Sequence, residues 1–226
     1  MAQASNRQRR SSSMPVVALA ESLQLATAQA QTLFRRNYQR VDSSLFWLAE
    51  NEPTLRKSGD AIDNGGETAI DPAQLWDIID QWFISVTEEM EKLHRMQQAL
   101  IEQEAIDTSS ITLHNTTTFE AEKRHPYTGR YLALLRLYDT IVIDATVLFL
   151  AEAYSNQQKQ QAIGRARKLL GRLGTNIITT NTRAVAAVKK FKANGASGGN
   201  AAAAPTDKPA PAPAQEPAAP AMAQAS

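Results

Sequence analysis

The sequence predicts a mainly α fold with a few short β-strands, an α+β arrangement dominated by helices. Over most of the chain, apolar residues recur every three or four positions, which is the period of a helix with one buried face. Two short stretches, residues 22–26 and 111–119, instead alternate apolar and polar side chains, as half-buried strands do. No cysteine is present, so disulfide bonds and thiolate zinc sites are excluded.

The 226 residues are enough for one domain with a substantial core and two tails. Residues 1–19 are expected to form a disordered basic arm, because this stretch begins with a run of Gln, Ser and Arg. The apolar run from Met14 to Ala20 is too short for a signal peptide, and a cytoplasmic location is expected. Residues 195–226 are rich in Ala and Pro and are expected to be a flexible tail. A single mainly helical domain is therefore predicted over residues 20–194.

The first predicted strand, residues 22–26, is followed by a predicted helix over residues 29–38. That helix ends in a basic cluster, Arg35, Arg36 and Arg40. Cations at this position oppose the partial negative charge of a helix C-terminus, so the cluster has a structural explanation.

Two further helices are predicted before the second strand. Asp42 begins a run of capping residues, so one helix is expected over residues 43–55. Turn-forming residues then predict a loop at residues 57–67. With Pro72 at its first position, a long helix is expected over residues 72–105, with one apolar stripe and an acidic opposite face.

Three helices are predicted after the second strand. Residues 130–153 are apolar nearly all round, so this helix is expected at the centre of the core or in a dimer interface. Ser155 is expected to cap a basic helix over residues 157–173, which Gly174 would end. A last helical pattern covers residues 177–192.

The charges are strongly segregated along the chain. The formal net charge is only +1, but residues 50–107 contain fourteen acidic and four basic residues. Residues 155–194 contain nine basic residues and no acidic one. A stretch of forty residues without a carboxylate favours a surface that faces a polyanion. This basic stretch is separate in the sequence from the acidic region at residues 50–107.

The strand-helix-helix order over residues 109–173 is typical of ribbon-helix-helix DNA-binding modules. In such a module, two strands, one from each subunit of a homodimer, form a ribbon in the major groove of double-stranded DNA. The polar side of the strand is therefore predicted to read bases through Thr112, His114 and Thr116. Six cations are predicted to hold phosphates: Lys123, Arg124, Arg130, Arg165, Lys168 and Arg172.

Two alternatives stay open at this point. The polar side of residues 111–119 can equally be a solvent-facing edge, because Thr is common in strands. The ribbon strand can also be residues 22–26, followed by the shorter helices at residues 29–38 and 43–55.

No motif for catalysis or metal binding occurs in the sequence. The three histidines, His94, His114 and His125, do not have zinc-site spacing, and no phosphate-binding glycine loop or nucleophile elbow is present. Asp139 and Asp144 interrupt the most apolar helix, so no membrane span is expected. We therefore expect no enzymatic activity, no cofactor, no metal and no small-molecule substrate.

Two segments resemble the AcaB family of conjugative plasmids and integrating conjugative elements. The segments are Leu23 to Arg35, and the run Pro126-Tyr127-Thr128-Gly129-Arg130-Tyr131-Leu132 with the residues up to Asp139. The resemblance implies a transcriptional regulator of the ribbon-helix-helix type that activates transfer genes. It departs from that type because the first predicted helix after the strand is about twice the usual length. The alternative is a structural or interaction protein of the conjugation machinery, with the acidic helix at residues 72–105 as its partner surface.

Overall fold

The computed structural model describes residues 17–59, 62–64 and 67–197. The predicted arm and tail therefore lie almost entirely outside the described residues. Four long helices dominate: α1 (Ala28–Ser58), α2 (Leu75–Gln103), α3 (Pro126–Leu150) and α4 (Asn156–Ser197). A two-stranded ribbon joins β1 (Leu19–Leu25) to β4 (Thr117–Lys123), and a small hairpin joins β2 (Ile62–Asn64) to β3 (Glu67–Ile70). The predicted class, mainly α with a few short strands, is confirmed.

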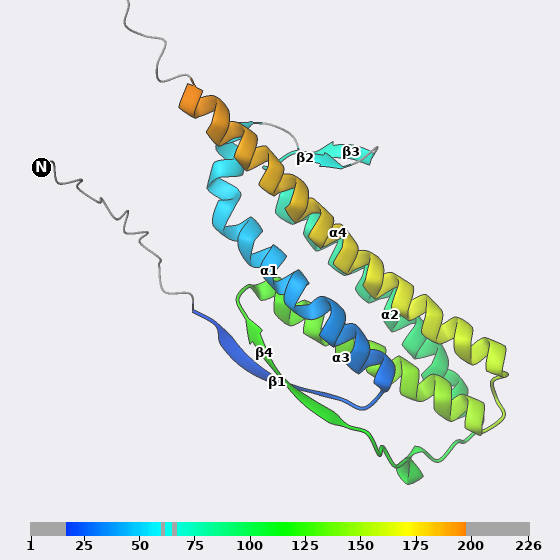
Figure 1. Cartoon of the computed structure of the whole chain (residues 1–226). Helices are drawn as coiled ribbons and strands as arrows, with labels where there is room; N and C mark the ends of the chain where they lie inside the picture. The colour runs from blue at the N-terminus through cyan, green and yellow to red at the C-terminus, as the bar shows by residue number, and fades with distance from the viewer. Residues whose placement is uncertain (1–16, 60–61, 65–66, 198–226) are drawn as a thin grey trace, which may run out of the picture.

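The elements form three layers, which Figure 1 shows from the side. The ribbon packs on α3 and α1, and α2 and α4 cover the opposite side of these two helices. The core lies between the layers and is built around α3, whose fully buried residues include Tyr131, Leu135 and Tyr138. A helix that packs on three others and on a ribbon is apolar nearly all round, as the sequence pattern predicts.

The strand-helix-helix order occurs twice in this chain. β1 is followed by α1, the β2–β3 hairpin and α2, and β4 is followed by α3 and α4. The second helix of each half packs against the first helix of the other half, α4 on α1 and α2 on α3. The two halves therefore interlock within one chain.

The ribbon differs from the one predicted. β1 and β4 pair antiparallel, with Leu23 opposite Phe119, so the two strands that were alternatives for the ribbon are partners of each other. The strand begins at Thr117, and residues 111–116 have no regular secondary structure. Leu23, Leu25 and Ala121 are fully buried, and this shared apolar side holds the two strands together on the helices. A ribbon with one strand from each of two subunits is therefore not what forms here.

Helix α1 is continuous where two helices were predicted. The capping residue Asp42 lies inside α1, is almost fully buried and accepts hydrogen bonds from the backbone and side chain of Arg124 and from the hydroxyl of Thr128. Because Arg124 and Thr128 supply these hydrogen bonds, the Asp42 carboxylate does not need the backbone N–H groups of a helix N-terminus, and the helix predicted to begin here does not begin here. The actual cap of α1 is Thr27, whose hydroxyl accepts a hydrogen bond from the Ala30 N–H.

Helix α4 is also continuous, and the prediction that Gly174 ends it was wrong. Gly174 is buried, and a Cβ atom there would lie 3.4 Å from the Tyr131 hydroxyl and 3.5 Å from a methyl group of Val41. The glycine therefore lets α4 approach α1 closely. Ser155 does cap α4, as predicted, through reciprocal hydrogen bonds with Gln158. No helix within the described ranges is both long and apolar enough to cross a membrane.

Candidate nucleic-acid interface and phosphate groove

The three residues predicted to read bases are not on the ribbon. Thr112, His114 and Thr116 are exposed in the segment that precedes β4. The side chain of Gln31 holds this segment on α1 by donating a hydrogen bond to the Asn115 carbonyl at 2.7 Å. The polar side chains therefore face solvent from an irregular segment, and no strand presents them as a row.

The outward side of the ribbon carries other residues. It is formed by the side chains that alternate with the buried ones, Ser22 and Gln24 on β1 and Thr118, Glu120 and Glu122 on β4, all exposed. Gln, Ser and Thr can read base edges. The two carboxylates, however, would lie among DNA phosphates without a cation on the same side of the ribbon to offset them. This side is therefore less suited to a major groove than a threonine-bearing ribbon would be.

Four of the six predicted phosphate contacts are paired with the protein's own carboxylates. Lys123 Nζ lies 2.6 Å from Glu21, and Arg165 lies 2.5 Å from Glu89 on α2. Arg124 pairs with Asp42, and Arg130 pairs with Asp80. The Arg130 guanidinium also lowers the pKa of Asp80 below its usual value. These four cations, on β4, α3, α4 and in the turn before α3, hold elements of the fold together, and among the six predicted residues only Lys168 and Arg172 have no ion pair in the described part of the chain.

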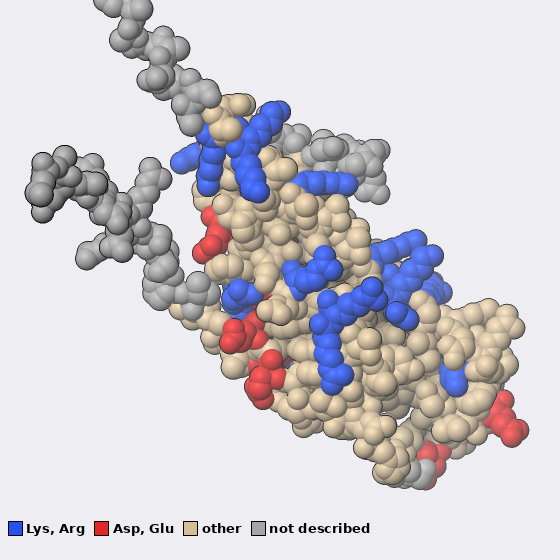
Figure 2. Space-filling model, in the orientation of Figure 1, with Lys and Arg blue, Asp and Glu red and all other residues tan. Residues whose placement is uncertain are grey.

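An unpaired set of cations lies on α1 and α4. We call the following exposed side chains the basic face; none of them has an ion pair in the described part of the chain: Arg36, Arg40, Arg167, Lys168, Arg172, Lys189, Lys190 and Lys192. Arg35, which lies over the Phe119 ring, and Lys57, in the last turn of α1, are also exposed and without an ion pair but are not counted in this face. Helix α4 contains no acidic residue at all. Figure 2 shows Lys and Arg side chains gathered over α1 and α4, with Asp and Glu toward the edges of this view.

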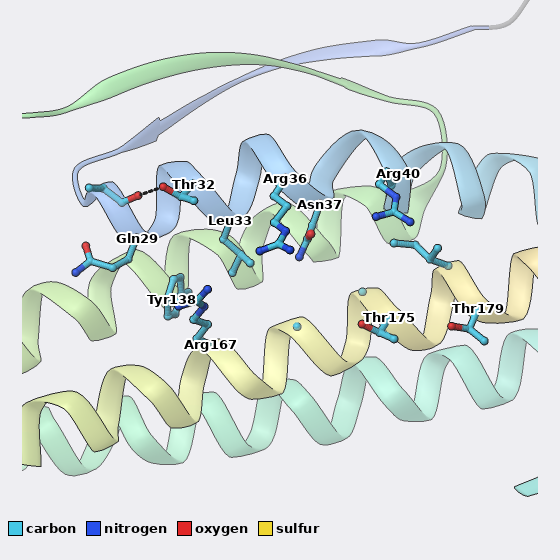
Figure 3. Close-up of a pocket in the computed structure, with 14 residues that line it drawn as sticks. Gln29, Thr32, Leu33, Arg36, Asn37, Arg40, Tyr138, Arg167, Thr175 and Thr179 are labelled. Atoms are coloured by element: carbon cyan, nitrogen blue, oxygen red, sulfur yellow. Dashed lines mark hydrogen bonds between the residues drawn. The ribbon is translucent and has the colours of Figure 1, made fainter. Parts of the chain in front are cut away.

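A groove opens within the basic face, between α1 and α4, with a volume of about 690 Å³. Arg36 and Arg40 line one wall, and Arg167 lines the other. In Figure 3, these arginines and Tyr138 of α3 point into the space between the two helices. The remaining polar lining consists of amide and hydroxyl side chains, and no carboxylate takes part: Gln29, Thr32, Asn37, Thr175 and Thr179.

Tyr138 forms part of the lining of this groove from beneath. Its side chain is 0% exposed, and its hydroxyl has no hydrogen-bond partner in the described structure. Burial raises the pKa of Tyr138, although the nearby Arg167 opposes this rise. The hydroxyl is therefore protonated at neutral pH and can donate a hydrogen bond into the groove.

Sequence reasoning missed the groove because its arginines had a plausible local explanation. Arg36 and Arg40 were assigned to the end of a short helix, which does not end there, and Arg167 was left outside the predicted contacts. One signal was present: the first half of α1, like α4, contains arginines and no carboxylate before Asp42. Periodicity could not show that these two helices face each other.

Other polar clusters have structural roles. His94 lies 2.9 Å from the buried Asp144, which also accepts a hydrogen bond from Gln98. The rings of Trp76, His125 and Tyr127 stack where α2 meets the start of α3. Among the described residues, no group of three or more His, Cys, Asp or Glu side chains is arranged to hold a metal ion.

Comparison with known proteins gives one solved structure of the same fold. No family model matches the sequence, and no curated protein matches it. The fold is similar to the crystal structure of selenomethionine-containing AcaB from uropathogenic E. coli, with a TM-score of 0.66 and 22% sequence identity. The likeness covers 84% of this chain and 93% of that chain. The fold is therefore AcaB-like, and at this identity the likeness concerns the fold alone.

Proposed function

We propose that this protein is a sequence-specific regulator that binds double-stranded DNA, with the basic face as its phosphate-contacting surface. The observation that carries the proposal is the row of unpaired cations on α4, a helix of 42 residues without a carboxylate. The basic-face cations on this helix run from Arg167 to Lys192, a length of about 38 Å, close to one turn of duplex DNA. A polyanion with regularly spaced phosphates matches such a surface in charge and in length.

The regulatory role rests on the AcaB-like fold together with the sequence resemblance. That resemblance leads us to expect control, most simply activation, of transfer genes on a mobile element. The proposed activity is binding without catalysis. Base reading is assigned to Thr112, His114 and Thr116, the exposed polar residues of the segment before β4 that Gln31 holds on α1.

The proposal predicts a loss of DNA affinity when basic-face cations are removed. In the double variant Lys168→Ala/Arg172→Ala, two exposed charges disappear and the fold should be unaffected. Binding of a duplex, measured by fluorescence anisotropy over a range of salt concentrations, should weaken. The slope of log affinity against log salt should become shallower by about two units, because each phosphate contact contributes about one.

Two controls make this test specific. The variant Arg56→Ala/Lys57→Ala removes the same charge from the end of α1 and should leave the slope unchanged. Arg165→Ala should have a small effect, because Glu89 already neutralises Arg165. Equal losses in all three variants would mean that net charge alone drives the binding, and the proposed surface would be wrong.

The alternative function is an interaction protein of the conjugation machinery. It is favoured by the exposed apolar residues Ile84 and Met96 on α2, which lie among the acidic residues of that helix. This alternative predicts no retention of duplex DNA at low salt, and capture of a transfer protein that is lost in Ile84→Asp/Met96→Asp.

A further inference from the structure

The groove between α1 and α4 has properties that an extended DNA-binding surface does not require. Its cations converge from two walls, and α4 provides open space between them, since a Cβ atom at Gly171 would meet nothing within 4 Å. The cations on the rest of the basic face stand on a convex helix surface. A concave site of this volume is the size of a small-ligand pocket.

The charge in the groove is not offset by the protein. Arg36 and Arg40 are four residues apart on α1, so they lie one above the other on the same side of the helix. Arg167 faces them from α4. The three guanidinium groups line one groove and repel one another, and no carboxylate of the lining reduces this repulsion. A bound dianion would remove the repulsion, and a monoanion would do so only in part.

Tyr138 provides an independent indication of a ligand. A fully buried hydroxyl without a partner costs free energy, and such groups are uncommon unless a ligand or water completes them. The chain places this donor in the lining of the groove that holds the three arginines. Thr175 and Thr179 supply further hydroxyls from α4.

We propose that this groove is a binding site for a phosphate monoester dianion, held by Arg36, Arg40 and Arg167 and by a hydrogen bond from the Tyr138 hydroxyl. A tetrahedral dianion has enough oxygen acceptors for three guanidinium groups and one hydroxyl at once, whereas a carboxylate has two oxygens. The volume accommodates a mononucleotide as well as inorganic phosphate. The groove lies within the basic face, but the dianion site does not depend on duplex binding.

The direct test is thermal stabilisation of the full chain by inorganic phosphate and by adenosine monophosphate. Each is compared with sodium chloride at equal ionic strength, because a ligand that binds the folded state raises its melting temperature. Arg167→Ala should weaken phosphate binding about tenfold or more, and Tyr138→Phe about three- to tenfold, as expected for lost charge-assisted hydrogen bonds. Lys168→Ala, one position from Arg167 and outside the groove lining, should change it less than twofold.

The variants also separate specific binding from a general salt effect. Phosphate stabilises many proteins without a site, so the stabilisation that remains in Arg167→Ala measures that background. Tyr138→Phe keeps the ring and removes a hydroxyl that has no hydrogen-bond partner in the protein, so the variant should fold normally. Equal stabilisation of the wild type, Arg167→Ala and Tyr138→Phe would overturn the proposal.

A second arm identifies the source of the phosphate group. Binding of a short duplex is measured with and without a 5′-phosphate, in the wild type and in Tyr138→Phe. A preference for the phosphorylated end that disappears in the variant assigns the site to a nucleic-acid terminus, whereas stabilisation by adenosine monophosphate without that preference assigns it to a free ligand. If neither appears while Lys168→Ala/Arg172→Ala still weakens duplex binding, the groove proposal fails and the proposed function stands.

Discussion

At the scale of single residues, buried carboxylates decide how the segments meet. Asp139 of α3 accepts hydrogen bonds from the N–H of Ala26 at 2.7 Å and from the N–H and hydroxyl of Thr27 at 2.9 and 2.5 Å. It thereby binds the turn between β1 and α1, more than one hundred residues away in the sequence. Asp42 does the same for the junction of β4 and α3 through Arg124 and Thr128. Each strand-to-helix turn is thus held by a carboxylate of the other half.

Replacing Asp139 should therefore destabilise the fold. Asp139→Ala leaves the N–H groups of Ala26 and Thr27 without acceptors in a partly buried place, and such a loss costs about 2–4 kcal/mol in the free energy of unfolding. Urea denaturation measures the change. The control Glu102→Ala removes an exposed carboxylate of α2 and should stay within about 0.5 kcal/mol of the wild type. A change in Asp139→Ala no larger than in the control would show that the turn does not depend on this side chain.

At the scale of elements, the approach of α4 to α1 determines both the core and the groove. Gly174 stands where the two helices are close, and Gly171, one turn earlier, leaves the groove open. Glycine weakens a helix by about 1 kcal/mol relative to alanine. Helix α4 nevertheless runs through both positions without a break, because its buried side packs along the core as far as Val188.

A larger side chain at Gly174 should separate the two helices. In Gly174→Leu, the added atoms would collide with Val41 and Tyr131, and overpacking of this kind costs about 1–3 kcal/mol. The matched substitution Gly164→Leu, at an exposed position of α4 with nothing within 4 Å, should be neutral or stabilising. Thermal unfolding of the two variants gives the comparison, and equal melting temperatures would argue against close helix packing at Gly174.

At the scale of the whole molecule, the ribbon is completed within one chain. A homodimer was predicted from the sequence because a strand-helix-helix unit needs a partner strand. Here β1 provides that strand for β4, and each half supplies a helix that covers the other. Both strands of the ribbon and the helices beneath it therefore come from one chain, while the predicted homodimer stays a prediction.

The melting temperature should accordingly not depend on protein concentration. An obligate dimer gains stability with concentration by mass action, whereas a chain that folds and stays monomeric does not. Calorimetry over a hundredfold range of concentration measures this. A steady rise of the melting temperature with concentration would mean that the native fold needs a second copy.

The sequence by itself determined the class of the fold, the positions of most helices, the burial of α3 and the segregation of charge. These properties follow from local periodicity and composition, which a single chain displays directly. The cap at Ser155, and the apolar pattern that runs nearly all round α3, are local properties of the same kind.

Only the tertiary structure decided which segments meet. β1 and β4 pair across almost one hundred residues, and Asp42 neutralises Arg124 across 82 positions. The same packing leaves Arg36, Arg40 and Arg167 unpaired around Tyr138. A sequence pattern shows which side of a helix is charged or apolar, but it does not show which helix or strand will pack against that side. The partner of each side chain, and so the difference between a structural ion pair and a binding site, is set by contacts distant in the sequence.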